Sequence, residues 1–191
     1  MKKFMTIALA ALTLAGCKQA AKSCDSDACA ADDTQKTTLV AYFSASGVTR
    51  NAAQLLATEL DADIFEIEPQ ELYTEDDLNW RDSTSRSSVE MKDASARPAI
   101  KALPEGLQNY ETIYLGFPIW WGVAPRVINS FIEQGELKAQ KIITFATSGG
   151  SELQPATDAL QQSYPDIKFI NGYLLNEATA ESVKAAVELA E

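Results

Sequence analysis

From residue 37 onward the chain alternates between short apolar runs and longer segments whose apolar residues recur every three or four positions. The short runs are rich in Val, Ile, Phe and Tyr, which is typical of buried strands, and the longer segments have helical periodicity. The predicted strands cover 37–43, 62–68, 111–116, 141–148 and 167–175. The predicted helices cover 48–60, 124–134, 153–164 and 178–191.

This alternation predicts an α/β protein with a parallel sheet and helices on both of its faces. Five strands in one domain fit a doubly wound fold with strand order 2-1-3-4-5, although periodicity alone does not establish the order. Ligands of such sheets bind beyond the carboxyl ends of the strands, at the switch point between strands 1 and 3. The residues directly after strands 1, 3 and 4 are therefore the most informative about function.

The loop after the first strand has features that suit an anion. It reads SASGVTR over 44–50 and leads into a helix, whose free N–H groups and dipole attract negative charge. Ser44, Ser46 and Thr49 add hydroxyl groups, and Gly47 permits a tight turn. The loop is neither a P-loop nor a G-x-G-x-x-G fingerprint, and no Lys is present to reach over a reactive phosphate. We expect it to hold a terminal phosphate without cleaving it; the alternative is an ordinary capped helix.

The loop after the third strand reads GFPIWWG over 116–122. Two adjacent tryptophans at a strand end are costly in a soluble protein unless they stack on something. A planar aromatic ligand would satisfy Trp120 and Trp121. The alternative is that both cover the helix at 125–134 as part of the core.

The loop after the fourth strand reads TSGGS over 147–151. Its two glycines allow a close approach to a flat ligand, and its hydroxyl and N–H groups suit a polar rim. By itself it could be a turn before a helix. Together the three loops would grip a phosphate, stack on a ring and bond a polar rim, and flavin mononucleotide (FMN) has all three features.

The three loop motifs together resemble those of a known protein family. From about residue 37 to 191 the chain resembles the flavodoxin-like family, in particular short members with the patterns YFSxSGxT, GxPIWWG and TSGGS. The resemblance implies a flavodoxin-like fold in which these loops bind FMN. By position, it implies phosphate contacts from Ser44, Ser46, Gly47, Val48 and Thr49. It implies ring contacts from Pro118, Ile119, Trp120, Trp121 and Gly122, and contacts to the pyrimidine side from Thr147, Ser148, Gly149 and Gly150. It also implies that the stretch around Asn79 and Trp80 lies over the flavin.

One polar segment, residues 69–110, departs from the alternation. Thr74 and Asp77 within it have the spacing that caps a short helix. A long ordered loop in a compact domain is usually functional, so we expect an ordered excursion beside the site. The alternative is a mobile surface insertion.

The amino-acid composition excludes several kinds of catalytic site and metal site. The chain has 27 acidic and 16 basic residues, a net charge of −11, which argues against a nucleic-acid partner. It has no histidine, so Ser-His-Asp triads, Cys-His pairs and histidine metal sites are excluded. We predict no catalytic side chain and no metal ligand, and assign the chemistry to the cofactor.

The N-terminus has the layout of a secretory signal. Residues 1–16 begin with two lysines followed by an apolar stretch too short to span a bilayer comfortably. Leu14-Ala15-Gly16-Cys17 resembles a bacterial lipobox, which implies a lipidated Cys17 as the first mature residue; the alternative is an ordinary signal with a chance cysteine. Residues 17–36 are predicted to form a flexible tether and 37–191 the FMN-binding domain.

These features predict an exported bacterial lipoprotein, held to a membrane on the periplasmic side. In enterobacterial sorting, a residue other than Asp after the lipidated cysteine favours the outer membrane, and Lys18 stands at that position. The oxidising compartment permits a Cys24–Cys29 disulfide. We expect an FMN-dependent electron-transfer protein whose partner is a redox protein or a small electron acceptor. The alternatives are an NAD(P)H-dependent FMN quinone reductase and, in another class, a flavin-free lipoprotein that binds a different phosphate ligand.

Overall fold

The computed structural model describes residues 36–138 and 140–188, which belong to the second of the two units of the chain, Gln35–Glu191. The predicted leader and the predicted lipidation site, Cys17, lie outside the described residues, as do Cys24 and Cys29. Within the described ranges, no helix has the length and apolar character needed to cross a membrane.

The core of the domain is a sheet of five parallel strands, in the order β2-β1-β3-β4-β5. The strands are β1 (Thr38–Tyr42), β2 (Asp63–Glu66), β3 (Thr112–Pro118), β4 (Lys141–Thr147) and β5 (Lys168–Leu174). This confirms the predicted doubly wound fold. The apolar runs are nearly continuous because parallel strands covered by helices are buried on both faces.

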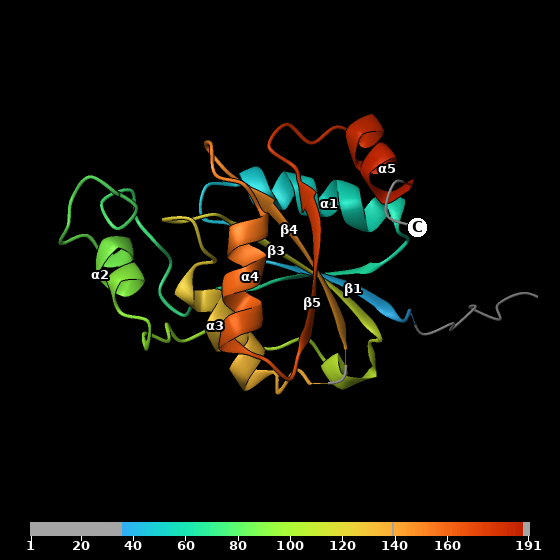
Figure 1. Ribbon diagram of the computed structural model, residues 1–191, viewed down its shortest axis with the longest axis horizontal. Helices are drawn as coiled ribbons and strands as arrows, with labels where there is room; N and C mark the ends of the chain where they lie inside the picture. The colour runs from blue at the N-terminus through green and yellow to red at the C-terminus, as the bar shows by residue number, and fades with distance from the viewer. Residues whose placement is uncertain (1–35, 139, 189–191) are drawn as a thin grey trace, which may run out of the picture. The chain divides into compact units, whose positions relative to one another are not determined.

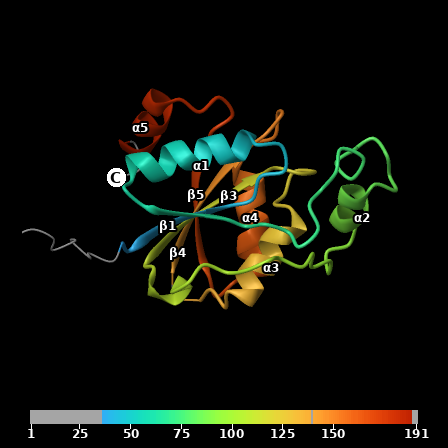
Figure 2. The same cartoon turned by 180° about the vertical axis from the view of Figure 1, so that it is seen from behind.

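Helices cover both faces of the sheet, as Figures 1 and 2 show from opposite sides. They are α1 (Val48–Glu59), α2 (Arg86–Lys92), α3 (Arg126–Gln134), α4 (Gln154–Ser163) and α5 (Ala180–Glu188), with a short 3₁₀ helix η1 at Leu107–Asn109. Helices α1 and α5 bury Leu56 and Val183 on one face. Helices α3 and α4 bury Phe131 and Leu160 on the other. The periodic apolar positions thus serve two separate cores, one on each side of the sheet.

Residues 70–99 leave the sheet as an excursion that closes on itself. At its base Pro69 and Ile100 form an antiparallel bridge, and Gln70 N donates to Ala99 O at 2.7 Å. The segment between them contains α2 and projects beyond one end of the sheet (Figure 1). The structure therefore confirms the ordered excursion and not a loose insertion.

The short helix expected at Thr74 was placed wrongly. Thr74 and Asp77 do exchange capping bonds: Thr74 N donates to Asp77 Oδ2 at 2.8 Å, and Asp77 N donates to Thr74 Oγ1 at 3.2 Å. The chain there forms only a turn over 75–78, and the helix of this region is α2, capped by Ser85. Helix α2 buries Met91, whereas the apolar residue of the turn, Leu78, is only partly buried, so capping alone did not decide the position.

Candidate functional site

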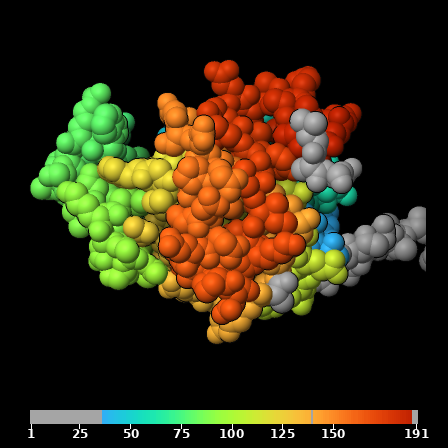
Figure 3. Space-filling view, in the orientation of Figure 1, coloured from blue at the N-terminus to red at the C-terminus, as the bar shows by residue number. Residues whose placement is uncertain are grey.

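The loops after β1, β3 and β4 meet the excursion around a cavity of about 650 Å³. In the space-filling view of Figure 3, a notch separates the green excursion from the orange loop after β4. The cavity is lined by Ala45, Ser46, Leu78, Trp80, Ser87, Pro118, Ile119, Trp120, Trp121, Ser148, Gly149, Gly150 and Ser151. Residues that are far apart in the sequence are therefore brought together at the predicted edge of the sheet.

The first loop contains two backbone N–H groups that have no hydrogen-bond partner among the described residues. Gly47 precedes α1 in the left-handed region, with φ 88°, a conformation that glycine adopts at little cost. Ser44 Oγ accepts hydrogen bonds from Gly47 N at 3.1 Å and Arg50 N at 3.2 Å. Among the described residues, none accepts a hydrogen bond from the N–H groups of Val48 or Thr49. These groups and the exposed Ser46 hydroxyl are the available anion donors at this end of the cavity.

Six of the predicted contact residues do not line the cavity in this structure: Ser44, Gly47, Val48, Thr49, Gly122 and Thr147. The Thr49 and Thr147 hydroxyls instead bond to each other at 2.8 Å, with both residues buried. Ser44 shapes the loop from inside, as its two accepted bonds show. The contacts of these six residues with a ligand stay a prediction. The structure shows that Ser44, Gly47 and the Thr49–Thr147 pair shape the loops.

Arg50 lies outside the cavity and is already paired. Its guanidinium donates from Nε to Glu66 Oε2 at 3.0 Å and from Nη2 to Glu66 Oε1 at 2.5 Å, and Tyr42 Oη donates to the same carboxylate. The hydrogen bond and charge of Glu66 raise the pKa of Arg50. Within the part of the chain that the structure describes, no charged side chain lines the cavity, and no group of three His, Cys, Asp or Glu could hold a metal ion.

The second loop is a tight hairpin that separates the roles of the two tryptophans. Trp120 and Val123 exchange backbone hydrogen bonds of 3.0 Å. Between them, Trp121 and Gly122 have φ 48° and 80°, as in a type I′ turn. Trp121 is 51% exposed at the tip of this turn, so the alternative in which both tryptophans belong to the core is wrong for Trp121.

Trp120 is held in an aromatic cluster. Its ring lies edge-on to Phe43 at 5.6 Å and to Tyr73 at 5.3 Å between centroids. The Tyr73 hydroxyl donates to Glu90, and burial together with this bond raises the pKa of Tyr73, so its phenol stays neutral. The cluster fastens the excursion to the wall of the cavity, because Tyr73 and Glu90 both belong to the excursion.

The third loop offers space beside its glycines. Ser148 Oγ accepts from Gly150 N at 3.1 Å and Ser151 N at 2.6 Å, and Ser148 N donates to Asn176 Oδ1 at 2.6 Å. A Cβ atom added at Gly149 or Gly150 would meet no protein atom within 4 Å. The hydrogen bonds of Ser148 thus hold the loop in shape, and the space beside Gly149 and Gly150 is open toward the cavity.

The excursion supplies a fourth wall that the motifs did not identify in full. Trp80 was predicted to lie over the ligand, and it lines the cavity with 65% of its surface exposed. Leu78 and Ser87 were not predicted. Nothing in the sequence distinguishes Ser87 from the other serines of its segment, because only the fold brings it to the cavity.

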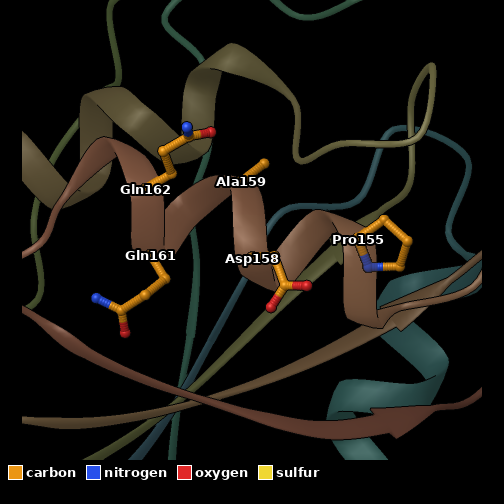
Figure 4. Close-up of a pocket in the computed structure, with 5 residues that line it drawn as sticks. All are labelled: Pro155, Asp158, Ala159, Gln161 and Gln162. Carbon is orange, nitrogen blue, oxygen red and sulfur yellow. The ribbon is translucent and has the colours of Figure 1, made fainter.

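A second hollow lies along α4 (Figure 4) and has a different character. All of its lining residues, Pro155, Asp158, Ala159, Gln161 and Gln162, belong to that single helix, and in Figure 4 their side chains spread apart. Asp158 accepts a hydrogen bond from Gln154 Nε2 at 2.7 Å. No convergent set of groups points to a ligand there.

The cavity at the sheet edge fits a flat aromatic group that carries a phosphate. It combines aromatic walls, an uncharged lining and open space beside two glycines, and its volume lies in the range of small-molecule sites. The unpaired N–H groups of Val48 and Thr49 belong to the first loop, which contributes Ala45 and Ser46 to the lining. The cavity also lies at the switch point of a doubly wound sheet. Its features and its position are those of the α/β proteins that bind nucleotide cofactors.

Comparison with known proteins identifies the family. The flavodoxin family matches residues 37–190, and the chain belongs to it. A comparison with curated proteins finds no match. Family membership supports FMN, the cofactor expected from the motifs.

Solved structures agree with this assignment. A candidate flavoprotein from Bacteroides uniformis is 50% identical, with a TM-score of 0.77, over 80% of this chain and 98% of that one. Another from Bacteroides eggerthii is 43% identical, also with a TM-score of 0.77, over 81% and 97%. A Lactobacillus acidophilus flavoprotein solved in complex with FMN is 22% identical, with a TM-score of 0.61, over 73% and 93%, and shares the fold.

Proposed function

We propose that the protein binds FMN in this cavity and transfers electrons between redox partners. The observation that carries the proposal is the meeting of the three loops and the excursion around one uncharged cavity. Ser46 and the N–H groups of Val48 and Thr49 would hold the phosphate. Trp120 and Trp121 would bracket the ring. The flavin, when bound, supplies the redox chemistry, and the protein binds, orients and shields it.

The mouth of the cavity supports transfer to an external acceptor. Trp80 and Trp121 each expose more than half of their surface there. Rings at this position would leave one edge of the ligand accessible to a redox protein or a small electron acceptor. The chain contains no Gly-rich fingerprint for a second nucleotide, which favours a carrier over a dehydrogenase with its own nicotinamide site.

The cofactor is tested by titrating the purified full chain with FMN in mild detergent. We expect quenching of flavin fluorescence at one equivalent and a yellow protein. A colourless protein that takes up no FMN would instead support the flavin-free phosphate-binding lipoprotein.

A second measurement separates the carrier from the reductase. The FMN-loaded protein is mixed with NADH or NADPH and a soluble quinone, and nicotinamide oxidation is followed at 340 nm. We expect slow oxidation for a carrier, whereas turnover at ordinary enzymatic rates, on the order of 1–10³ per second, would assign the reductase.

We also propose that lipidated Cys17 anchors the domain to a bacterial membrane on the periplasmic side. Support comes from the lysine-led apolar leader and the Leu14–Cys17 motif. Cys17→Ala should move the protein from the membrane fraction to the soluble fraction and abolish acyl labelling. Cys24→Ala is the matched control and should change neither; equal fractionation of both variants would contradict the anchor.

A further inference from the structure

Ser87 has a buried hydroxyl group without a hydrogen-bond partner in the wall of the cavity. The residue lies on α2, lines the cavity and is 1% exposed. Its Oγ is buried, and it has no hydrogen-bond partner among the described residues. Buried hydroxyls are rarely left without a partner, because desolvation then costs free energy that nothing offsets.

The neighbouring serines show that the lack of a partner is specific to Ser87. Ser85 Oγ donates to Ser88 Oγ at 2.9 Å and accepts from Ser88 N at 3.3 Å. Both of these residues are buried on the same short segment, as Ser87 is. The backbone N–H of Ser87 is also paired, since it donates to Asp77 O at 3.0 Å. Among these three buried serines, only Ser87 has a side chain without a hydrogen-bond partner in the described part of the chain.

The surroundings of Ser87 indicate which part of a ligand it faces. The excursion residues that line the cavity with it are Leu78 and Trp80, an apolar side chain and an aromatic one. The anion donors, by contrast, lie on the first loop. A hydroxyl among apolar and aromatic side chains suits the polar rim of a flat heteroaromatic ring better than a phosphate.

We propose that Ser87 is a cofactor-binding residue whose hydroxyl donates a hydrogen bond to a rim acceptor of the bound ring. The inference rests on the proposed function, because it takes the flavin as the ring. Because the hydroxyl is buried, the proposal requires a rotation about the Cα–Cβ bond of Ser87 or a displacement of the exposed Trp80 when the ligand binds. The excursion thereby becomes part of the binding site and not only its cover.

The test compares Ser87→Ala with Ser88→Ala in the full chain, using both FMN and riboflavin as probes. For Ser87→Ala we expect the Kd to rise about tenfold for FMN and by the same factor for riboflavin, because the lost bond is to the ring that they share. The visible absorption bands of the bound flavin should also shift. The melting temperature of the apoprotein should not fall, since the hydroxyl has no protein partner to lose.

Ser88→Ala should behave in the opposite way. It breaks a bond within the protein, so the apoprotein should melt a few degrees lower, with about 2–4 °C expected for a bond of ordinary strength. Its flavin spectrum should stay unchanged and its Kd within about twofold of the wild type.

Three results would overturn the assignment of Ser87. They are an unchanged Kd in Ser87→Ala, a loss confined to FMN, and a fall in apoprotein stability equal to that of Ser88→Ala. Failure of the wild-type protein to bind either flavin would overturn the proposed function and this inference together. Normal wild-type binding with an unaffected Ser87→Ala would overturn the inference alone.

Discussion

The hydroxyl groups of Thr49 and Thr147 lie 2.8 Å apart inside the protein, although 98 positions separate the two residues in the sequence. Thr49 belongs to the first turn of α1, and Thr147 is the last residue of β4. Their bond joins the loop after β1 to the loop after β4, across the end of β3. A bond between two buried protein hydroxyls therefore ties together the segments that follow β1 and β4.

Replacing either threonine by valine should destabilise the protein by about 1–3 kcal/mol, because the remaining hydroxyl is left buried without a partner. Valine keeps the shape of the side chain, so little of the effect should come from packing. The Thr49→Val/Thr147→Val double variant should lose clearly less than the sum of the single variants, as measured by urea unfolding. Additive losses would show that the two hydroxyls act independently.

Alanine substitutions at Ser44 and Ser46 should separate the effect on loop stability from the effect on phosphate binding. Ser44→Ala removes the acceptor of two backbone N–H groups, so it should cost about 1 kcal/mol of unfolding free energy. Ser46 is exposed and faces the cavity, so Ser46→Ala should change stability by less than about 0.5 kcal/mol.

Binding should show the reverse pattern. Ser46→Ala should raise the Kd for FMN roughly tenfold and leave riboflavin unaffected, because riboflavin lacks the phosphate. Fluorescence titration with both flavins makes the comparison. Equal losses for the two flavins would show that Ser46 does not serve the phosphate.

Much of the fold could be predicted because strands and helices are set by short-range patterns. The runs around Val40 and Leu115 are apolar on both faces because the parallel sheet is covered on both sides. Loops that follow neighbouring strands then converge by topology alone, which is why Ser46, Trp121 and Gly149 could be grouped before the structure was known.

What could not be predicted depends on contacts distant in sequence. The bond between Thr49 and Thr147 requires the strand order, which periodicity does not provide. The unpartnered hydroxyl of Ser87 and the anchoring role of Tyr73 depend on where the excursion folds back. Thr74 has a sound capping pattern but no apolar stripe behind it, so local signals alone placed a helix where tertiary packing does not support one.

Trp121 should contribute to binding with little effect on folding, and Trp120 to both. Trp121→Ala is expected to change the unfolding free energy by less than about 0.5 kcal/mol, since the ring is half exposed, while weakening FMN binding about tenfold. Trp120→Ala should cost about 3 kcal/mol, because its ring packs on Phe43 and Tyr73.

The Trp121→Gly variant provides a matched control for Trp121→Ala. Trp121→Gly loses the same ring as Trp121→Ala but tolerates the φ of 48°, so it should be about 1 kcal/mol more stable than the alanine variant. Both variants should bind FMN equally weakly. A difference in affinity between them would mean that the turn conformation, and not the ring, governs binding.

Two partly buried tyrosines, Tyr110 and Tyr164, predict a loss of stability at alkaline pH. Burial, with hydrogen bonds to Asp63 and Glu133 respectively, raises the pKa of Tyr110 and of Tyr164 to about 12. An unfolded tyrosine has a pKa of about 10, so above that pH the unfolded chain loses phenolic protons that the folded chain keeps. Stability from these groups is fully present below pH 10 and is lost as the pH rises toward 12.

The urea midpoint should therefore be nearly flat from pH 8 to about 9.5 and fall above it. The Tyr110→Phe/Tyr164→Phe variant lacks both phenols, so its midpoint should fall less steeply over the same range; an identical slope would show that other groups cause the loss.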